Sequence, residues 1–458
     1  MEHTIAAIST SIGEAGIGIV RMTGRDAIAI GEQAFHPIRE HRVGEKDHRV
    51  LLYGHILDED QVIDEVLIAF MFAPHTYTRE DMVEIYTHGS TVSVKKVLEL
   101  LLKLGAQVAE RGEFTKRAFL NGRLDLSQAE AVIDLIQAKT ERSYNQSLYQ
   151  LNGGLKHEVQ VLRDGLMRQL AYVEVAINFS EDGQEELSTE KLQEGLRGLI
   201  GQIQSLLDTT NKGKILRDGV NTIIIGKPNV GKSSLLNLLL REERAIVTDV
   251  PGTTRDVIEE FINIREVAIR LVDTAGIRDT QDQVEKIGVE RSVELSKKAD
   301  LIVAVFDISK PLDEEDQQII ELIKGKKAIV LLNKIDLGSA IVPEEFSKLL
   351  GDVKIIETSM NHEIGIHELE EAIVELFYLG DIHSDAGIVI SNARHEDLLN
   401  KSLSALESAY GDLIAQVPLD CLEVDLRDAW TKLGEITGET ATTEDLLDKI
   451  FGEFCIGK

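Results

Sequence analysis

The 458-residue chain is poor in cysteine, proline and tryptophan, with two, seven and one of each. The two cysteines, Cys421 and Cys455, cannot form a disulfide framework or a four-ligand zinc site. Sparse proline and the lack of any compositionally biased segment exclude a chain that is mainly disordered. No apolar run approaches the roughly 18 residues that would span a bilayer, and the opening MEHTIAAIST lacks the basic and apolar regions of a secretion signal. We therefore expect a soluble, cytoplasmic protein.

Positive charge is also scarce, because 49 lysines and arginines stand against 79 aspartates and glutamates, for a net charge of −30. The excess of acid extends along the whole length, and no segment is basic. A protein that holds nucleic acid by neutralising phosphates usually has a Lys/Arg-rich domain or face. Any role with nucleic acid is therefore expected to be shared with a basic partner.

What is present is a globular composition, 43% hydrophobic, and a length that suggests roughly three domains. Residues 1–118 mix short apolar runs, Gly-rich turns and a helical stretch over 92–104, which is typical of an α+β domain. Residues 119–216 and 380–458 carry apolar side chains at helical spacings of three and four. Residues 217–379 alternate apolar strands with helices, which predicts a doubly wound sheet. The simplest architecture is a helical domain in two parts, with the α/β domain inserted between them.

These patterns also give local expectations. The triplet Asn152-Gly153-Gly154 interrupts a long helical period, so a break or kink is expected there, at a cost of about 1 kcal/mol per glycine. The strands expected in the α/β domain are 222–226, 257–264, 267–272, 301–306, 328–332 and 354–357. In the first domain they include 17–20, 66–72 and 83–86.

The segment Gly226-Lys227-Pro228-Asn229-Val230-Gly231-Lys232-Ser233 follows the first strand of the α/β domain and precedes an apolar helical segment. This GxxxxGK[ST] pattern predicts a phosphate-binding loop, in which glycines let backbone N–H groups surround the phosphates. Lys232 would reach the β- and γ-phosphates, and the Ser233 hydroxyl would be a ligand of Mg²⁺. The flanking strand and helix argue against a chance match.

Further motifs follow in the order and spacing of GTP-binding proteins. Asp273-Thr274-Ala275-Gly276 can offer a carboxylate to Mg²⁺ through water and an amide to the γ-phosphate. In Asn333-Lys334-Ile335-Asp336, the last carboxylate can accept from the guanine N1 and N2 hydrogens, which adenine does not supply. Ser359-Met360-Asn361, after the next strand, stands where such proteins place a loop against the base. The loop 248–256 has hydroxyls for a metal, and its Arg255 is at least as consistent with a structural role as with an arginine finger.

The residues predicted to bind GTP are therefore drawn from four motifs and the loop between them. They are Asn229, Val230, Gly231, Lys232, Ser233, Ser234, Thr248, Asp249, Val250, Pro251, Gly252, Thr253, Thr254, Asp273, Thr274, Ala275, Gly276, Asn333, Lys334, Asp336, Ser359, Met360 and Asn361.

With these motifs, the chain resembles the bacterial and organellar tRNA-modification GTPases, the MnmE/TrmE family, essentially from end to end. The motifs that carry the resemblance are GIGIVR (Gly16–Arg21), RGEFTKRAFLNGRLDLSQAEA (Arg111–Ala131), GKPNVGKSSLLN (Gly226–Asn237), TDVPGTTRD (Thr248–Asp256), DTAGIR (Asp273–Arg278), VEKIGVERS (Val284–Ser292) and FCIGK (Phe454–Lys458). The GTTRD loop and the terminal CIGK together are highly specific to this family among P-loop GTPases.

The resemblance implies a folate-binding, dimerising N-terminal domain (1–118), a helical domain (119–216 and 380–458), and an inserted Ras-like GTPase domain (217–379). It implies a homodimer that works with an FAD-dependent partner, which also uses NADH, in a heterotetramer or larger complex. That complex would install an aminomethyl-type group at C5 of the wobble uridine of tRNA, with a 5-formyl-tetrahydrofolate-type folate as the C1 donor. The partner would carry most of the tRNA binding, which suits a chain without a basic segment.

For hydrolysis, the resemblance implies that K⁺ takes the place of an arginine finger. By matching motif positions, the K⁺ ligands would be Asn229, Thr248, Val250 and Thr253, and the Mg²⁺ ligands Ser233 and Thr254. Glu285 would orient the attacking water beside the catalytic Lys232. A glutamate that opens a helix over 285–297 is also favoured by the helix dipole alone, so a structural reading of Glu285 stays open.

For folate, the resemblance implies a site at Arg21, Glu84, Arg123 and Lys458. Arginine and lysine can meet folate carboxylates, whereas a carboxylate such as Glu84 can pair with the amino-pyrimidine edge of the pterin. Lys458 must then reach the first domain, with Cys455 close to the folate. A catalytic thiol that attacks an iminium, an acid, and a packed cysteine all remain possible roles for Cys455.

The chain departs from the family pattern at several positions, namely Ser11-Ile12 for a common Pro-Pro, Arg111 for Pro, Arg123 for Lys, and Ser359-Met360-Asn361 for a Ser-Ala-Lys-like loop. Two other function classes compete with the tRNA-modifying enzyme. One is a GTP-gated ribosome-assembly factor, which would normally add a basic RNA-binding module. The other is a scaffold in which hydrolysis only times the release of a partner.

Overall fold

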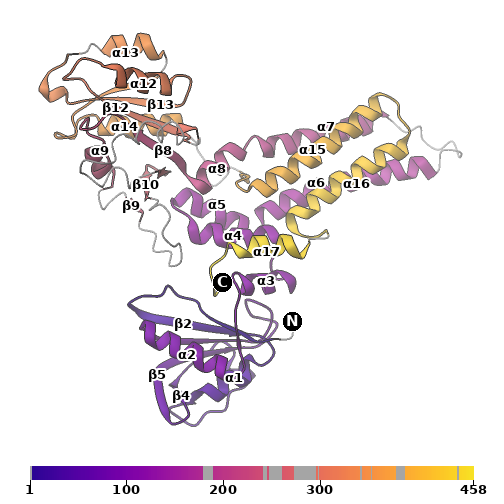
Figure 1. The fold of residues 1–458 in the computed structure, drawn as a ribbon. Helices are drawn as coiled ribbons and strands as arrows, with labels where there is room; N and C mark the ends of the chain where they lie inside the picture. The colour runs from indigo at the N-terminus through magenta and orange to yellow at the C-terminus, as the bar shows by residue number, and fades with distance from the viewer. Residues whose placement is uncertain are drawn as a thin grey trace.

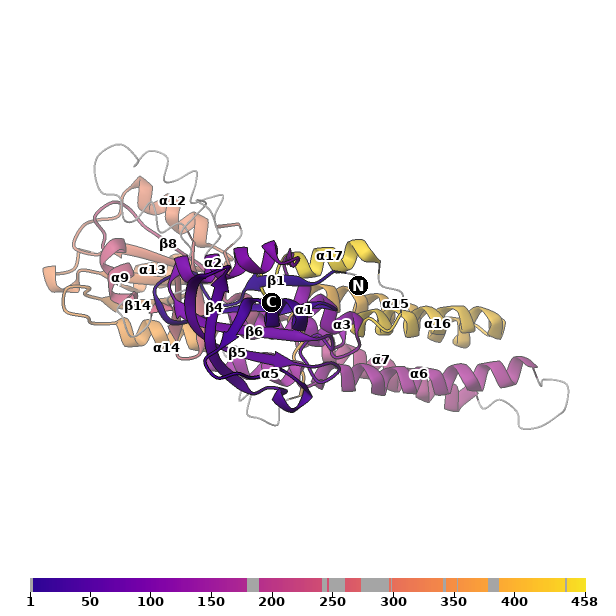
Figure 2. The same cartoon turned by 90° about the horizontal axis from the view of Figure 1, so that it is seen from below.

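The computed structural model describes residues 3–178, 189–240, 245–246, 260–272, 296–297, 299–340, 343–351, 353–377, 387–440 and 443–458. Its elements form three bodies: a sheet domain that contains the N-terminus, a long helical body, and a second sheet domain at the far end (Figure 1). Figure 2 shows the same three bodies from below, with helices α6 and α16 extending away from both sheets. Among the described residues, no helix is long and apolar enough to cross a membrane.

The N-terminal sheet has seven strands in the order β3-β4-β5-β6-β2-β1-β7. Its strands are β1 (Ile5–Ile8), β2 (Ala15–Thr23), β3 (Phe35–Pro37), β4 (Leu51–Asp58), β5 (Gln61–Met71), β6 (Met82–Gly89) and β7 (Gln107–Val108). Helices α1 (Ala27–Ala34) and α2 (Thr91–Lys103) pack on one face over a core that includes Phe70, Ile85 and Leu101. The α+β expectation and the helix expected over 92–104 are confirmed.

The helical body joins two distant parts of the chain. Its elements are α3 (Glu113–Leu120), α4 (Leu126–Gln137), α5 (Glu141–Leu151), α6 (Gly154–Asn178), α7 (Thr189–Leu207), α8 (Thr210–Asp218), α15 (Ala393–Ile414), α16 (Leu419–Thr437) and α17 (Glu444–Gly452). One apolar core, with Leu166, Leu196, Leu406 and Leu426 among its buried members, unites α6 and α7 with α15 and α16. The expected break is confirmed, because α5 ends before Gly153, whose φ of 93° is left-handed.

The second sheet has the order β14-β13-β12-β8-β11-β10-β9. Its strands are β8 (Val220–Ile225), β9 (Ala245–Ile246), β10 (Glu260–Ile264), β11 (Val267–Leu271), β12 (Leu301–Asp307), β13 (Ala328–Asn333) and β14 (Lys354–Thr358). The five strands from β14 to β11 pair in parallel. Strand β10 pairs antiparallel with both of its neighbours, β11 and β9. Helices α9 (Lys232–Leu239) and α14 (Ile366–Leu376) cover one face, and α12 (Glu314–Ile323) and α13 (Pro343–Leu350) the other. The predicted doubly wound sheet is therefore confirmed, with strand β9 not anticipated. Residues 257–259 of the predicted strand 257–264 lie outside the described residues.

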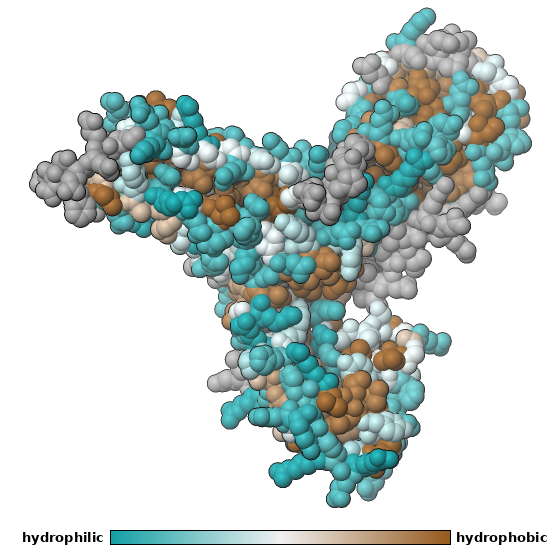
Figure 3. All heavy atoms as spheres, turned by 180° about the vertical axis from the view of Figure 1, so that it is seen from behind, coloured by the Kyte–Doolittle hydropathy of each residue, from teal (hydrophilic) through white to brown (hydrophobic). Residues whose placement is uncertain are grey.

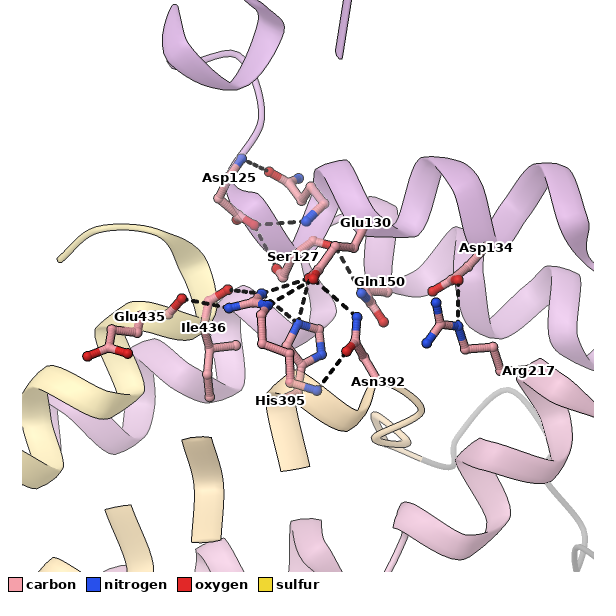
Figure 4. Close-up of polar contacts among 12 residues, drawn as sticks. Asp125, Ser127, Glu130, Asp134, Gln150, Arg217, Asn392, His395, Glu435 and Ile436 are labelled. Carbon is pink, nitrogen blue, oxygen red and sulfur yellow. Dashed lines mark hydrogen bonds and ion pairs between the residues drawn. The ribbon is translucent and has the colours of Figure 1, made fainter. Parts of the chain in front are cut away.

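A buried polar network ties the two parts of the helical body together (Figure 4). Arg394 donates from Nε to Oε1 of Glu130, on α4, at 2.9 Å and from Nη2 to Glu130 Oε2 at 2.7 Å. The His395 Nε2 atom also lies 2.7 Å from Glu130 Oε2. Asn392 Nδ2 donates to the same carboxylate at 3.1 Å. One turn along α4, Asp134 accepts from Arg217 Nε at 2.9 Å. Arg217 lies at the end of α8, the last helix before β8. The Asp134–Arg217 contact therefore holds α8, which leads into the second sheet domain, against α4.

Candidate functional site

The loop between β8 and α9 has the conformation of a phosphate-binding loop. Gly226 has a φ of 155° and Gly231 a φ of 111°, both in the region that favours glycine. A Cβ atom on Gly226 would lie 2.4 Å from the Val305 carbonyl oxygen, and one on Gly231 would lie 2.3 Å from Asn333 Nδ2. Any other residue would push the loop away from the sheet. The loop thus directs the N–H groups at the start of α9 towards a common space, which suits an anion.

Lys232 and the serines after it stand at the mouth of this loop. The Lys232 Nζ atom donates to the carbonyl oxygens of Gly226 and Lys227, both at 2.7 Å. Its ammonium group therefore lies over the loop, where phosphate oxygens would meet it. Ser233 and Ser234 are exposed in the first turn of α9. Asn229 is exposed as well and has a left-handed φ of 63°.

Asn333, at the end of β13, connects the phosphate loop to the loop after β14. Its Nδ2 atom donates to the Val230 carbonyl oxygen at 2.7 Å. Its Oδ1 atom accepts from the Met360 backbone N–H at 3.1 Å. The side chain is 2% exposed, so both contacts are made away from water. Asn333 therefore fixes the distance between the region for phosphates and the region for a base.

Asp336 presents the carboxylate that the motif predicts for guanine. Its Oδ1 atom accepts from the Ser359 hydroxyl at 2.6 Å, and the residue is otherwise exposed. This hydrogen bond lowers the pKa of Asp336 below its ordinary value and keeps the group an acceptor. Lys334, with a left-handed φ of 72°, donates from Nζ to Asp307 Oδ2 at 2.7 Å. Asn361 is exposed beside this loop.

The structure thus brings together at the carboxyl ends of β8, β13 and β14 the residues predicted from three motifs, where open α/β sheets bind their ligands. The predicted residues that lie outside the described part of the chain are Thr248, Asp249, Val250, Pro251, Gly252, Thr253, Thr254, Asp273, Thr274, Ala275, Gly276 and Glu285. This set includes the residue predicted to orient water, the second predicted Mg²⁺ ligand and three of the four predicted K⁺ ligands.

A second cluster of predicted residues lies on the N-terminal sheet. Arg21 on β2 and Glu84 on β6 are directly opposite in the strand register, and Arg21 Nη2 lies 3.0 Å from Glu84 Oε1. Tyr86 donates from its hydroxyl to Glu84 Oε2 at 2.7 Å. Burial and this hydrogen bond raise the pKa of Tyr86 to about 12. Within the described part of the chain, the buried Arg21 Nε atom has no hydrogen-bond partner.

The last residues of the chain dock onto this cluster. Ser9 Oγ donates to the Gly457 carbonyl oxygen at 3.3 Å, and Arg21 Nη1 donates to it at 3.4 Å. Gly457 has a φ of 89°, and a Cβ atom there would lie 2.4 Å from the Ile8 carbonyl oxygen, so glycine is required. Burial and the charge of Arg21 lower the pKa of Lys458. Cys455 is exposed beside this contact, with its carbonyl oxygen 3.4 Å from the Gly112 amide nitrogen.

Arg123 lies over an aromatic ring rather than in the ion pair of Arg21 and Glu84. Its guanidinium carbon is 4.5 Å from the centroid of the Tyr77 ring. It lines a cavity of about 490 Å³ together with Arg49 and Arg79. The sequence reasoning did not find these two arginines, which share no motif with Arg123. It also missed Tyr86, although a residue two positions after Glu84 must point to the same face of a strand.

Comparison with known proteins places the chain in a family. A family model described as "GTP-binding protein TrmE N-terminus" matches residues 4–123, and one described as "MnmE helical domain" matches residues 126–455. A relative from Finegoldia magna named "tRNA modification GTPase MnmE" is 54% identical over 100% of both chains. A relative of the same name from Clostridioides difficile is 50% identical over 100% of both chains.

Among solved structures, the G domain of the T. maritima FeoB iron transporter is similar to 34% of this chain and 97% of its own, at 28% identity and a TM-score of 0.27. The relatives in the previous paragraph extend over every body of the fold, which the two family models divide between them. The chain therefore belongs to the MnmE family of tRNA modification GTPases.

Proposed function

We propose that this GTPase of tRNA modification is activated by K⁺ and acts with an FAD-dependent partner protein. Together they would use a folate-borne C1 unit to install an aminomethyl-type group at C5 of the wobble uridine. The observation that carries the proposal is the presence, in one chain, of a phosphate loop tied through Asn333 to the base-binding loop and a separate Arg21–Glu84–Lys458 cluster. In this proposal, residues 1–118 bind folate and residues 217–379 bind GTP.

Hydrolysis of GTP to GDP and phosphate would proceed by positioning and charge stabilisation, since phosphoryl transfer leaves little covalent work to the protein. Lys232 would exchange its loop carbonyls for the β- and γ-phosphate oxygens. The exposed Ser233 hydroxyl is an oxygen donor of the kind that Mg²⁺ prefers, and Thr254 would complete the protein's share of the ligands. Asp273 would contact the Mg²⁺ through water, and Glu285 would orient the attacking water.

A monovalent cation would replace the arginine finger. The exposed Asn229 side chain stands at the mouth of the loop, with an amide oxygen that fits a hard cation. The other proposed ligands are Thr248, Val250 and Thr253. K⁺ held there would offset the negative charge that develops on the phosphate oxygens.

The folate would bind at Arg21, Glu84, Arg123 and Lys458. Glu84 could pair with the amino-pyrimidine edge of the pterin. The buried Arg21 Nε atom, which has no hydrogen-bond partner among the residues that the structure describes, could donate to the ligand. The exposed Cys455 would lie near the C1 unit. The folate would supply the one-carbon unit. The partner protein would supply FAD and NADH.

A homodimer through the N-terminal domain accounts for its exposed apolar surface. Tyr53 on β4 and Leu67 on β5 face each other in the register and are 50% and 40% exposed. Leu51 on the same strand is 53% exposed. Apolar residues also gather on this domain as seen from behind (Figure 3). Their burial in a symmetric dimer, together with a larger complex with the FAD-dependent partner and tRNA in the cytoplasm, completes the proposal.

GTP turnover by the purified chain in KCl and in NaCl at equal ionic strength tests the mechanism. Hydrolysis is expected to be much faster in KCl, because Na⁺ is too small for a site built for K⁺. Equal turnover in the two salts would rule out the proposed cation site. Unchanged GTP affinity between the two salts would be the control that nucleotide binding itself is intact.

A further inference from the structure

A cationic cavity in the N-terminal domain contains Arg123 together with residues that belong to none of the motifs named above. It has a volume of about 490 Å³ and opens to solvent. Its walls combine the segment after the η1 turn (Glu45–Asp47), the loop between β5 and β6, and the residues after α3. The lining residues are His48, Arg49, Pro74, His75, Thr76, Arg79 and Arg123.

The arginines of this cavity are not neutralised by acidic neighbours. Arg49 donates from Nη2 to the His75 carbonyl oxygen, and Arg79 donates from Nη1 to the Asn121 carbonyl oxygen at 2.9 Å. Arg123 lies over the Tyr77 ring. In the part of the chain that the structure describes, no carboxylate forms an ion pair with any of these guanidinium groups. A chain of net charge −30 thus keeps positive charge concentrated at one place on its surface.

The carboxylates that are close in sequence are engaged elsewhere. Glu80 pairs with Arg117 at 3.0 Å, and Asp81 accepts from the Ala73 backbone N–H at 2.8 Å. The backbone also holds the cavity's arginines in an uncommon conformation. Arg49 has a φ of 62° and Arg79 a φ of 59°, both in the left-handed region. This conformation is uncommon for residues other than glycine.

A chain of aromatic contacts connects Arg123 of the cavity to Arg21 of the Arg21–Glu84–Lys458 cluster. Tyr77, whose ring contacts the Arg123 guanidinium group, packs in the same apolar cluster as the buried Phe114. The guanidinium carbon of Arg21 lies 5.7 Å from the centroid of the Phe114 ring. A cluster with a carboxylate and a cavity with three arginines are therefore linked through Tyr77 and Phe114. Those are the complements of the two ends of a folate, the amino-pyrimidine edge and the glutamate carboxylates.

We propose that this cavity binds the glutamate tail of the folate and selects folates with more than one glutamate. The inference rests on the proposed folate function. A single glutamate has two carboxylates, and each further γ-linked glutamate adds one. The guanidinium groups of Arg49, Arg79 and Arg123 could therefore each meet one carboxylate of a longer tail with a two-pronged, charge-assisted contact.

Calorimetric titration of the full-length protein with 5-formyltetrahydrofolate, as the monoglutamate and as the triglutamate, tests the proposal. The triglutamate is expected to bind about tenfold more tightly, and the preference to fall to within about twofold in the Arg49→Gln/Arg79→Gln variant. The matched control is Arg25→Gln, an exposed arginine of the same domain outside the cavity, which should keep the full preference.

The alternative outcomes separate the two proposals. Equal affinity of the wild type for both tail lengths would overturn the tail site and leave the folate function standing. Failure of the wild type to bind either folate would overturn both. An unchanged tail preference in the double variant, combined with a loss of tRNA binding at moderate salt, would reassign the cavity to RNA phosphates and overturn the proposal. The wild-type comparison needs no substitution, so it holds even if the double variant fails to fold.

Discussion

Glu130→Gln is expected to destabilise the helical body by about 3 kcal/mol. Burial alone would raise the pKa of Glu130, but His395 and Arg394 outweigh it and lower the pKa from 4.5 to about 2. At about 1.4 kcal/mol per pKa unit, that shift corresponds to about 3 kcal/mol. Removing one member of a buried ion pair costs about 3–5 kcal/mol for the same reason, because the partner's charge stays buried. The glutamine side chain has nearly the same volume, so packing loss contributes little.

The chain's single tryptophan, Trp430, makes this prediction measurable in a protein of several domains. Trp430 lies on α16 and packs against the core of the helical body. The centroid of its ring is 4.0 Å from the guanidinium carbon of Arg163. Because the chain has no other tryptophan, its fluorescence reports the unfolding of that body. Urea unfolding followed by Trp430 emission should show the lower free energy of unfolding of Glu130→Gln. Asp397→Asn is the control, because it breaks an exposed Asp397–Lys401 pair on α15 that contributes less than about 1 kcal/mol. A cost no larger than that of the control would refute the reasoning.

The same carboxylate sets a pH dependence whose sign is fixed. A glutamate with a folded-state pKa below its unfolded value stabilises the fold above the unfolded pKa. That contribution is lost as the pH falls from 4.5 towards about 2. The wild type and Glu130→Gln should therefore differ most near neutral pH and converge across this acid range. If the free energies of unfolding of the two proteins changed in parallel with pH, the lowered pKa of Glu130 would be contradicted.

The remaining predictions concern the two proposed sites. Asp336→Asn should weaken GTP binding by about a hundredfold and shift preference towards xanthosine nucleotides, because the guanine donors lose their acceptor; unchanged GTP affinity in a titration would count against it. Cys455→Ser should keep GTP hydrolysis near normal and abolish tRNA modification, because a hydroxyl is far less ionised than a thiol. Normal modification would rule out a catalytic role for the exposed Cys455 thiol. Asn333→Ala should raise the Kd for GTP without changing guanine preference, because it releases the phosphate loop from the base loop, and competition with ATP measures both.

The nucleotide-binding domain was predictable because its signals are local. Gly226 and Gly231 are needed where a strand turns into a helix, and their spacing is readable in the sequence. The strands themselves are continuous apolar runs, since both faces of that sheet are covered. Even there, the predicted strand 222–226 ends one residue too late, because the φ of Gly226 already belongs to the loop.

The N-terminal domain was less predictable because its sheet is half exposed. Only parts of three of its strands were expected. Strand β4 places Leu51 and Tyr53 in solvent, so its apolar residues do not outline a buried face. Long-range contacts were also beyond reach of the sequence alone. The hydrogen bond between Arg21 and the Gly457 carbonyl oxygen joins residues 436 positions apart, and the placement of Arg123 beside Arg49 and Arg79 depends on the whole sheet.

The most direct test of the central claim is a measurement of modified nucleosides in tRNA. A bacterial strain that lacks its own member of this family would carry either the wild-type chain or Lys232→Ala, in which the phosphate loop loses its ammonium group. Mass spectrometry of digested tRNA is expected to show the C5-modified wobble uridine restored by the wild type and absent with Lys232→Ala. Equal amounts of that nucleoside in the strain with and without the wild-type chain would contradict the account.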